Sequence, residues 1–215
     1  MSSHKNGGCM RRTALALTII GTMLLGAGSA QASTLFSGGG LITYVGNPGE
    51  KNDVSVGTGS LLGGTVPVYT FQDADANPIT TIGGPCEMIN GVGMCRPEFV
   101  GSLIIDVRDR DDTATVQESV GIGALMIGGR GVDVLMGGNG GDILKGNDGR
   151  DSLRGRGGAD SYKGGRGRDT LQTLDGLRDV FISCGDGNDD FLRKDAVDPR
   201  GHHCEHSNHK NPSKP

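Results

Sequence analysis

Residues 128–172 read GGRGVDVLM, GGNGGDILK, GNDGRDSLR, GRGGADSYK and GGRGRDTLQ, five consecutive units of nine residues without a gap. The first and fourth positions of every unit are Gly, the sixth is Asp, and the eighth is Leu or Tyr. A flexible Gly/Asp linker would not hold four positions fixed over five units. The regular period therefore indicates a repeat fold in which each unit is one structural element.

The fixed positions define the expected backbone and the candidate site. Glycine permits positive φ and close approach of two backbones, so the first six residues of a unit are expected to form a tight turn. The last three residues are expected to be extended, with the eighth side chain facing the interior. The turn glycines are Gly128, Gly129, Gly131, Gly137, Gly138, Gly140, Gly146, Gly149, Gly155, Gly158, Gly164, Gly165 and Gly167, and the Asp residues are Asp133, Asp142, Asp151, Asp160 and Asp169.

The composition agrees with a turn-rich repeat. The chain has 215 residues, of which 40 are Gly and none is Trp, so a core of large apolar side chains is hard to build. Calcium takes roughly six to eight oxygen ligands, including carboxylates and backbone carbonyls, and such turns supply both. A solenoid that folds without metal is the less favoured alternative, because buried carboxylates without buried bases are costly.

The nonapeptide pattern resembles the haemolysin-type (RTX) calcium-binding repeats. The resemblance implies an all-β fold, a right-handed parallel β-roll (β-solenoid), in which each unit is half a coil and calcium lies between units i and i+2. It implies that Asp133, Asp151 and Asp169 line one side of the roll. Asp142 and Asp160 would line the other side. Carbonyls of the first four residues of each unit would complete the ligands of about three sites.

Basic residues are the atypical feature of the repeats. Residues 128–172 contain eight Lys and Arg residues against six Asp. Asn147 and Arg156 replace the second glycine of their units, which predicts weaker calcium binding there. The basic residues are interpreted as solvated turn charge, and the alternative is a stripe that binds anionic cell-wall or surface polymers. Neutralising Arg154, Arg156, Arg166 and Arg168 would test this alternative.

The N-terminus is typical of an export signal. Arg11 and Arg12 precede an apolar run from Ala14 to Leu25, and residues 30–32 read AQA, which fits signal cleavage before Ser33. The apolar run is short for a membrane-spanning helix, although an uncleaved anchor is the alternative. We therefore expect residues 1–32 to be a signal peptide, a secreted or extracellular protein, and no membrane span after cleavage.

Charge argues against nucleic-acid binding. Residues 1–32 contain three basic residues and no acidic one, which leaves 18 basic and 25 acidic residues and a formal net charge of −7. A general nucleic-acid binder would instead be strongly basic.

Four cysteines follow the predicted cleavage site, and an even number in an exported chain favours disulfides. The preferred connectivity of the three possible is Cys86 with Cys95 and Cys184 with Cys204. The alternative is a zinc site that uses Cys204 together with His202, His203 and His206, although a C-x-x-C partner is missing.

The segments that flank the repeats are less regular. Residues 33–120 contain short β-type stretches between Gly, Pro and Asn, and are expected to be an irregular β segment that caps or extends the solenoid. An independent small β-sandwich is the alternative. Residues 108–113 resemble a degenerate repeat, with Asp112 as a weaker calcium candidate. The predicted strands are Leu41–Val45, Asp53–Val56, Val66–Phe71, Leu103–Val107 and Thr113–Val116.

The repeat register changes after Gln172. Residues 185–191 form a partial unit, with Asp189 as a weaker calcium candidate. Residues 121–205 are thus expected to be the calcium-binding roll with a C-terminal cap closed by a disulfide, because a solenoid needs capping. Residues 206–215 are expected to be a disordered polar tail.

The function expected from these features is calcium binding in a secreted, calcium-stabilised structural or interaction protein. Enzyme motifs of the RTX-bearing proteases and lipases, H-E-x-x-H and G-x-S-x-G, are missing, and residues 33–201 contain no His. We therefore expect no catalysis, and a secreted hydrolase or adhesin-like surface binder with an RTX module is the alternative. A pore former is not expected, since no long apolar segment remains after residue 32.

Overall fold

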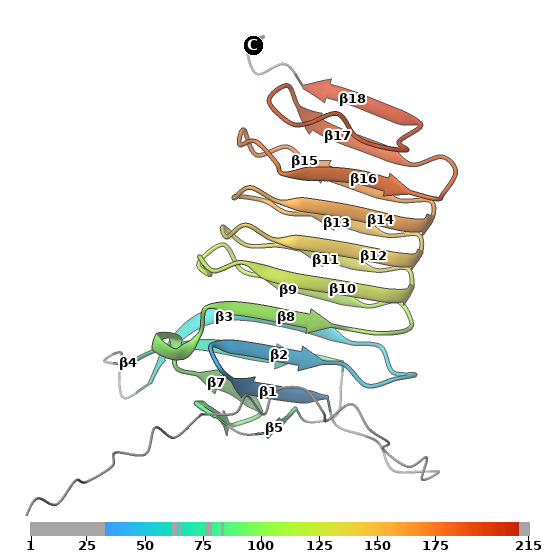
Figure 1. Ribbon diagram of the computed structural model, residues 1–215. Coiled ribbons are helices and arrows are strands. Elements are labelled where there is room, and N and C mark those ends of the chain that lie inside the picture. Colours follow the sequence, from blue (N-terminus) through green and yellow to red (C-terminus); the bar gives the residue numbers. More distant parts are fainter. Residues whose placement is uncertain (1–32, 62–63, 65, 76–78, 83, 211–215) are drawn as a thin grey trace, which may run out of the picture. The chain divides into compact units, whose positions relative to one another are not determined.

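The computed structural model describes residues 33–61, 64, 66–75, 79–82 and 84–210, so the expected signal segment 1–32 lies outside the described residues. Within that part of the chain, nearly all regular structure is β-strand, and η2 (Pro97–Phe99) is a short 3-10 turn. From residue 102 to residue 195 successive strands alternate between two sheets, so this part of the chain winds into stacked coils (Figure 1). The predicted parallel β-roll is confirmed, and the linker interpretation is wrong.

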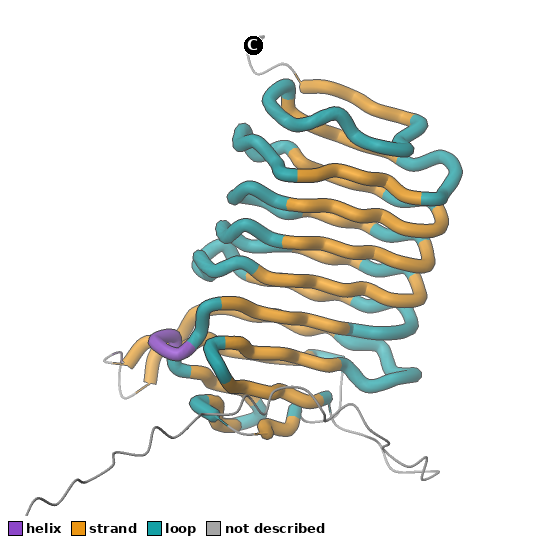
Figure 2. Tube along the Cα trace, in the orientation of Figure 1, coloured by secondary structure: helices purple, strands orange, loops and turns teal. Residues whose placement is uncertain are grey.

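The two sheets are built from strands of successive coils. The eight-stranded sheet has the order β16-β14-β12-β10-β8-β2-β1-β5, and the ten-stranded sheet has the order β18-β17-β15-β13-β11-β9-β3-β4-β7-β6. Turns gather along the two edges where the chain crosses between the sheets (Figure 2). The parallel coil strands are β8 (Ser102–Asp106), β9 (Thr113–Val116), β10 (Ala124–Gly131), β11 (Val134–Met136), β12 (Ile143–Gly149), β13 (Ser152–Arg154), β14 (Ser161–Gly167), β15 (Thr170–Thr173), β16 (Phe181–Gly185), β17 (Phe191–Asp195) and β18 (His206–Lys210).

The core is a ladder of the eighth-position side chains. Leu135 pairs in register with Leu153, and Leu153 pairs with Leu171, so residues 18 apart stack in one row. On the facing sheet Leu144 pairs with Tyr162. All five side chains are buried. Full burial of such a side chain contributes roughly 1.5–3 kcal/mol, so the narrow core depends on keeping this register.

The coils continue into the N-terminal segment. There β2 (Leu41–Val45) pairs in parallel with β8, and β3 (Asp53–Leu61) pairs in parallel with β9. Antiparallel pairing then ends the stack: β1 adds to β2, and a meander of β4, β7 and β6 adds to β3. The end strands are β1 (Thr34–Gly38), β4 (Val66–Asp73), β5 (Thr80–Ile82), β6 (Cys86–Ile89) and β7 (Val92–Cys95).

Two disulfides lie near the ends of the stack. Cys86 and Cys95 are cross-strand partners on β6 and β7, and Cys184 on β16 is joined to Cys204. Because Cys204 is bonded to Cys184, it is not a thiolate ligand, and the zinc alternative is wrong.

The tail differs from the expectation of disorder. His206–Lys210 is strand β18 and pairs in parallel with β17, while residues 211–215 lie outside the described residues. Composition suggested a solvated tail, but β17 would otherwise be an edge strand with unpaired backbone groups. Such an edge readily accepts a further strand.

Candidate metal centre

The turns form two columns, one along each edge of the coils. Column A comprises the turns that lead from the eight-stranded to the ten-stranded sheet, which are residues 107–112, 128–133, 146–151, 164–169 and 184–190. Column B comprises the turns that lead back, residues 116–124, 137–142, 155–160 and 173–179. It ends with residues 194–198, after which the chain makes an isolated bridge from His202 to Ser183 of the eight-stranded sheet. We call the Asp at which a turn ends its rung. The columns therefore separate the rungs of odd and even repeats.

The five rungs of column A form a hydrogen-bonded ladder. Oδ1 of Asp133 accepts the backbone N–H of Asp112 at 3.0 Å. Oδ1 of Asp151 accepts the N–H of Asp133, and Oδ1 of Asp169 accepts the N–H of Asp151, each at 2.9 Å. Oδ1 of Asp190 accepts the N–H of Asp169 at 2.7 Å. The rungs are at most 2 % exposed. Each carboxylate is thus fixed by the backbone of the preceding coil.

Two residues outside the nonapeptides end this ladder. The backbone N–H of Asn52 donates to Oδ1 of Asp112 at 2.6 Å, and its Nδ2 donates to the Val107 carbonyl at 3.1 Å. At the other end, Oε2 of Glu205 accepts the N–H of Asp190 at 3.0 Å. The ladder therefore begins at a neutral amide and ends at a carboxylate, and neither end was predicted from the sequence.

The second carboxylate oxygen has no partner in column A. Oδ2 of all five rungs is buried without a hydrogen bond, and these rungs are Asp112, Asp133, Asp151, Asp169 and Asp190. An unsatisfied buried oxygen of this kind costs about 1–3 kcal/mol, and more when the group is charged. A bound cation would offset this cost at every rung of column A.

Backbone oxygens lie close to the unpartnered carboxylate oxygens. A Cβ added to Gly128 would lie 2.5 Å from Oδ2 of Asp133 and 2.9 Å from the carbonyl oxygen of Gly146. A Cβ on Gly146 would likewise overlap Oδ2 of Asp151. Glycine at the first position thus leaves a carboxylate and a carbonyl facing the same small space. Oxygen donors of these two kinds fit calcium, which is a hard cation.

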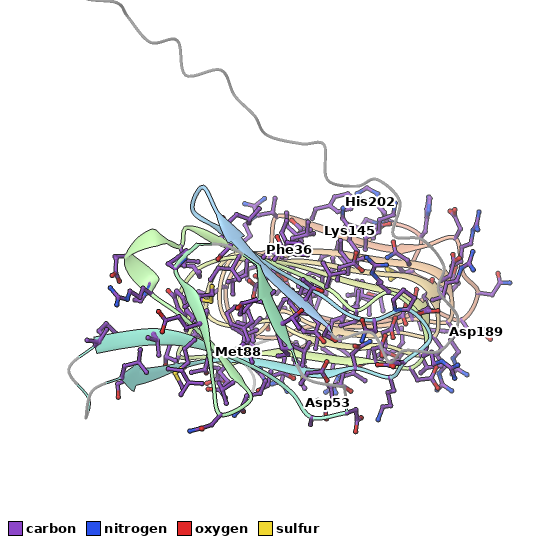
Figure 3. All side chains as sticks on the ribbon, turned by 90° about the horizontal axis from the view of Figure 1, so that it is seen from below. Phe36, Asp53, Met88, Lys145, Asp189 and His202 are labelled. Carbon is purple, nitrogen blue, oxygen red and sulfur yellow. A yellow bond between two sulfur atoms is a disulfide. The ribbon has the colours of Figure 1, made fainter. Side chains whose placement is uncertain are left out.

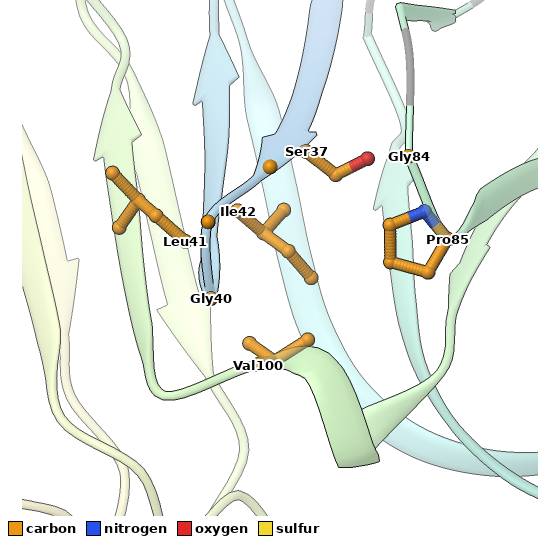
Figure 4. A pocket seen from close by; sticks show the side chains of 9 residues that line it. Ser37, Gly40, Leu41, Ile42, Gly84, Pro85 and Val100 are labelled. Carbon is orange, nitrogen blue, oxygen red and sulfur yellow. The ribbon is translucent and has the colours of Figure 1, made fainter. Parts of the chain in front are cut away.

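Side-chain clusters of other kinds are not found. Among the described residues, no three His, Cys, Asp or Glu side chains gather as a metal-binding group. A hollow of about 350 Å³ between the β1–β2 turn, Pro85 and Val100 is lined by Gly, Ser and apolar residues (Figure 4). This lining offers no acid or base for catalysis.

Burial changes the titration of the rungs. Burial raises the pKa of Asp133 and Asp169 to about 7 and that of Asp151 to about 6, and the backbone hydrogen bonds only partly oppose this. For Asp133 the neighbouring carboxylates of Asp151 and Asp112 raise the pKa further. The ladder therefore resists full ionisation at neutral pH unless a cation joins it.

The C-terminal repeat has a different acidic residue from the one we expected. Asp190, not Asp189, is the rung, because the turn 184–190 has one more residue than the turn 164–169 that it stacks on. Asp189 has a φ of 64°, lies at the outer edge of the coils and pairs with His206 at 3.8 Å (Figure 3). The available signal was spacing, since Asp190 precedes the buried Leu192 by two residues, as Asp169 precedes Leu171.

The basic residues do not form one stripe. Arg154 and Arg156 lie at column B, whereas Arg166 and Arg168 lie at column A. Arg166 pairs with Asp148 at 3.7 Å on the surface, and Arg156 is turned toward backbone carbonyls. These four residues therefore do not build the continuous surface for a polymer that was considered above.

Comparison with known proteins agrees with the geometry. A family model described as the RTX calcium-binding nonapeptide repeat (4 copies) matches residues 125–144 and 136–171. No curated protein and no solved structure matches the chain. No helix among the described residues is long and apolar enough to cross a membrane.

Proposed function

Because residues 125–171 belong to the RTX calcium-binding nonapeptide repeats, we propose that this protein is an exported structural module whose solenoid is completed by calcium in its turns. The proposed ligands are the rung carboxylates and the carbonyl oxygens of the first four positions of each turn. The observation that carries the proposal is the row of buried, unpartnered Oδ2 atoms in column A.

Calcium would supply the positive charge that balances the rung carboxylates. The carboxylates of Asp133 and Asp151 are linked through a backbone N–H, so their negative charges are held in neighbouring coils. The chain itself positions the oxygens, keeps water out of the turn and sets the spacing of the coils. A bound divalent cation stabilises the ionised form of these carboxylates, and its binding energy becomes folding energy.

The RTX β-roll is a structural, calcium-binding fold rather than a catalytic one. Extracellular calcium modules typically bind with dissociation constants of roughly 10⁻⁴–10⁻³ M, which suits a protein that becomes ordered after export. Two disulfides fit an oxidising compartment. The signal-like residues 1–32 support export by an N-terminal signal.

A calcium titration tests the structural role. Purified protein is stripped with a chelator, and calcium is added while β-type circular dichroism and bound calcium are recorded. We expect the β signal and the bound calcium to rise together below several millimolar. An unchanged spectrum with no bound calcium would overturn the proposal.

Export has a separate test. The protein is expressed with its N-terminus intact, and the mature chain in the medium is sequenced from its N-terminus. We expect a sequence that begins at Ser33. Retention of residues 1–32 in a membrane fraction would contradict export as a soluble protein and would leave calcium binding untouched.

A further inference from the structure

The two columns differ in how their carboxylates are satisfied. In column B, Oδ2 of Asp142 accepts the N–H of Gly138 at 2.8 Å, and Oδ2 of Asp160 lies 3.4 Å from the Tyr162 hydroxyl. All five column A rungs lack such partners. The chain thus supplies donors in column B that it does not supply in column A.

At the C-terminal end of column B, a rung carboxylate again has protein donors. Oδ2 of Asp198 accepts the hydroxyl of Thr173 at 2.7 Å and the N–H of Asp195 at 2.8 Å. Between these turns Asp179, together with Asp175 of the same turn, keeps an unpartnered Oδ2. Asp179 is therefore the one described rung of column B with an unpartnered Oδ2, and the other rungs of column B have protein partners. Gly137 still faces Oδ2 of Asp142 and the Gly155 carbonyl, as Gly128 does its counterparts in column A.

Column B also contains a guanidinium group directed at backbone oxygens. Arg156 takes the second position of its turn with a φ of 68°. Its Nη1 donates to the carbonyl of Gly137 at 3.0 Å and to that of Val116 at 2.8 Å. These carbonyls belong to the two preceding turns of column B, so one side chain links three coils. Its side chain is 20 % exposed.

A second cation closes the column. Lys194 is buried at 6 % exposure, and its Nζ donates to the carbonyls of Asp195 at 2.9 Å and Asp198 at 3.0 Å. A buried ammonium is tolerated only where oxygens surround it. Both cations of column B thus engage turn carbonyls, and the Gly137 carbonyl is one of the first-position oxygens proposed above as calcium ligands.

We propose that the chain's own cations, Arg156 and Lys194, take the place of calcium along column B, so that calcium concentrates in column A. The column of ions extends beyond the matched repeats 125–171, to Asp112 at one end and Asp190 at the other. The one calcium position in column B lies at Asp179 and Asp175. This inference rests on the proposed function, because it assigns the positions of the ions.

Matched rung substitutions test the assignment. Asp151→Asn in column A and Asp142→Asn in column B are the same chemical change in adjacent repeats. Bound calcium per chain is counted by native mass spectrometry in calcium buffer. We expect Asp151→Asn to lose at least one ion and Asp142→Asn to keep the wild-type number. Equal losses would overturn the inference, whereas a wild-type chain without any calcium would overturn the proposed function.

The cation itself is tested by Arg156→Gln with Arg166→Gln as the control, since Arg166 lies on the surface. In saturating calcium we expect Arg156→Gln to lower the Tm with the calcium count unchanged, and Arg166→Gln to leave both unchanged. An unchanged Tm for Arg156→Gln would contradict the role. Anomalous scattering from wild-type crystals grown in calcium locates the ions independently of any variant, and an ion between Gly137 and Arg156 would overturn the inference.

Discussion

Oδ1 of Asp151 accepts the backbone N–H of Asp133, 18 residues earlier in the chain, at 2.9 Å. This single bond joins a side chain of one coil to the backbone of the preceding coil, and it leaves the other oxygen of Asp151 without a partner. The stacking of the coils and the proposed cation binding therefore depend on the same carboxylate. The predictions below separate the two roles.

Chelation is expected to destabilise the roll. A site filled at 100 times its dissociation constant adds about 2.7 kcal/mol to the free energy of unfolding, so several filled sites together exceed the stability of many domains. Thermal unfolding is followed in excess chelator and in saturating calcium, and we expect a much lower Tm in chelator. Magnesium is the control ion, because its preference for short octahedral bonds should prevent it from restoring the Tm. A Tm that is the same in chelator and calcium contradicts the prediction.

The stability of the metal-free roll should fall as the pH rises. The stability of a protein whose carboxylates form ion pairs instead rises with pH over the acidic range. Burial raises the pKa of Asp133 and Asp169 to about 7, above the ordinary value of 3.8, so the folded state holds protons that the unfolded state releases. The stabilising effect of these protons is complete below the unfolded pKa of 3.8 and is lost as the pH rises through 7.

In chelator we therefore expect the Tm to fall as the pH rises from 4 to 8, a range that covers the raised pKa of about 7. Saturating calcium is the control, since metal binding requires ionised carboxylates and should reverse the trend. A Tm in chelator that rises over this range would contradict the raised pKa values.

Gly149→Ala is expected to break the stacking of column A. Gly149 has a φ of 151°, and an added Cβ would overlap the carbonyl oxygen of Gly131 in the preceding turn. Strain and overpacking together should cost at least about 2 kcal/mol in the free energy of unfolding. Gly121→Ala is the control, because nothing lies within 4 Å of its added Cβ, and a change below about 0.5 kcal/mol is expected there. Denaturant unfolding in saturating calcium measures both, and equal effects would refute the steric argument.

The C-terminal disulfide is expected to stabilise the last coil. Cys184 and Cys204 are 20 residues apart, and closing a loop of this size contributes about 3 kcal/mol by the chain-entropy estimate. Replacing both cysteines by Ser should lower the free energy of unfolding by about that amount. The Cys86–Cys95 pair closes a loop of separation 9, so its double Ser variant should lose less. A larger loss from the shorter loop would contradict the entropic explanation.

Much of the roll was predictable because its repeat is local in sequence. A nine-residue unit with Gly at the first and fourth positions and Asp at the sixth predicts a turn and a short strand from residues that are neighbours in the chain. The resemblance to the RTX repeats, in which two units make a coil, places Leu135, Leu153 and Leu171 in one row, and the structure pairs them in register. The same resemblance implied the separation of odd and even Asp residues into two sides.

Only the tertiary structure decided how each oxygen is satisfied. Asn52 reaches Asp112 across 60 residues, and Arg156 reaches Val116 across 40, so these contacts depend on how intervening loops close. The choice of Asp190 over Asp189 likewise depends on one extra residue in a turn. The sequence determined the period of the coil, because backbone conformation is set locally. The donor that satisfies each oxygen was decided by packing between coils, because a carbonyl or carboxylate accepts whatever donor the neighbouring coil brings within reach.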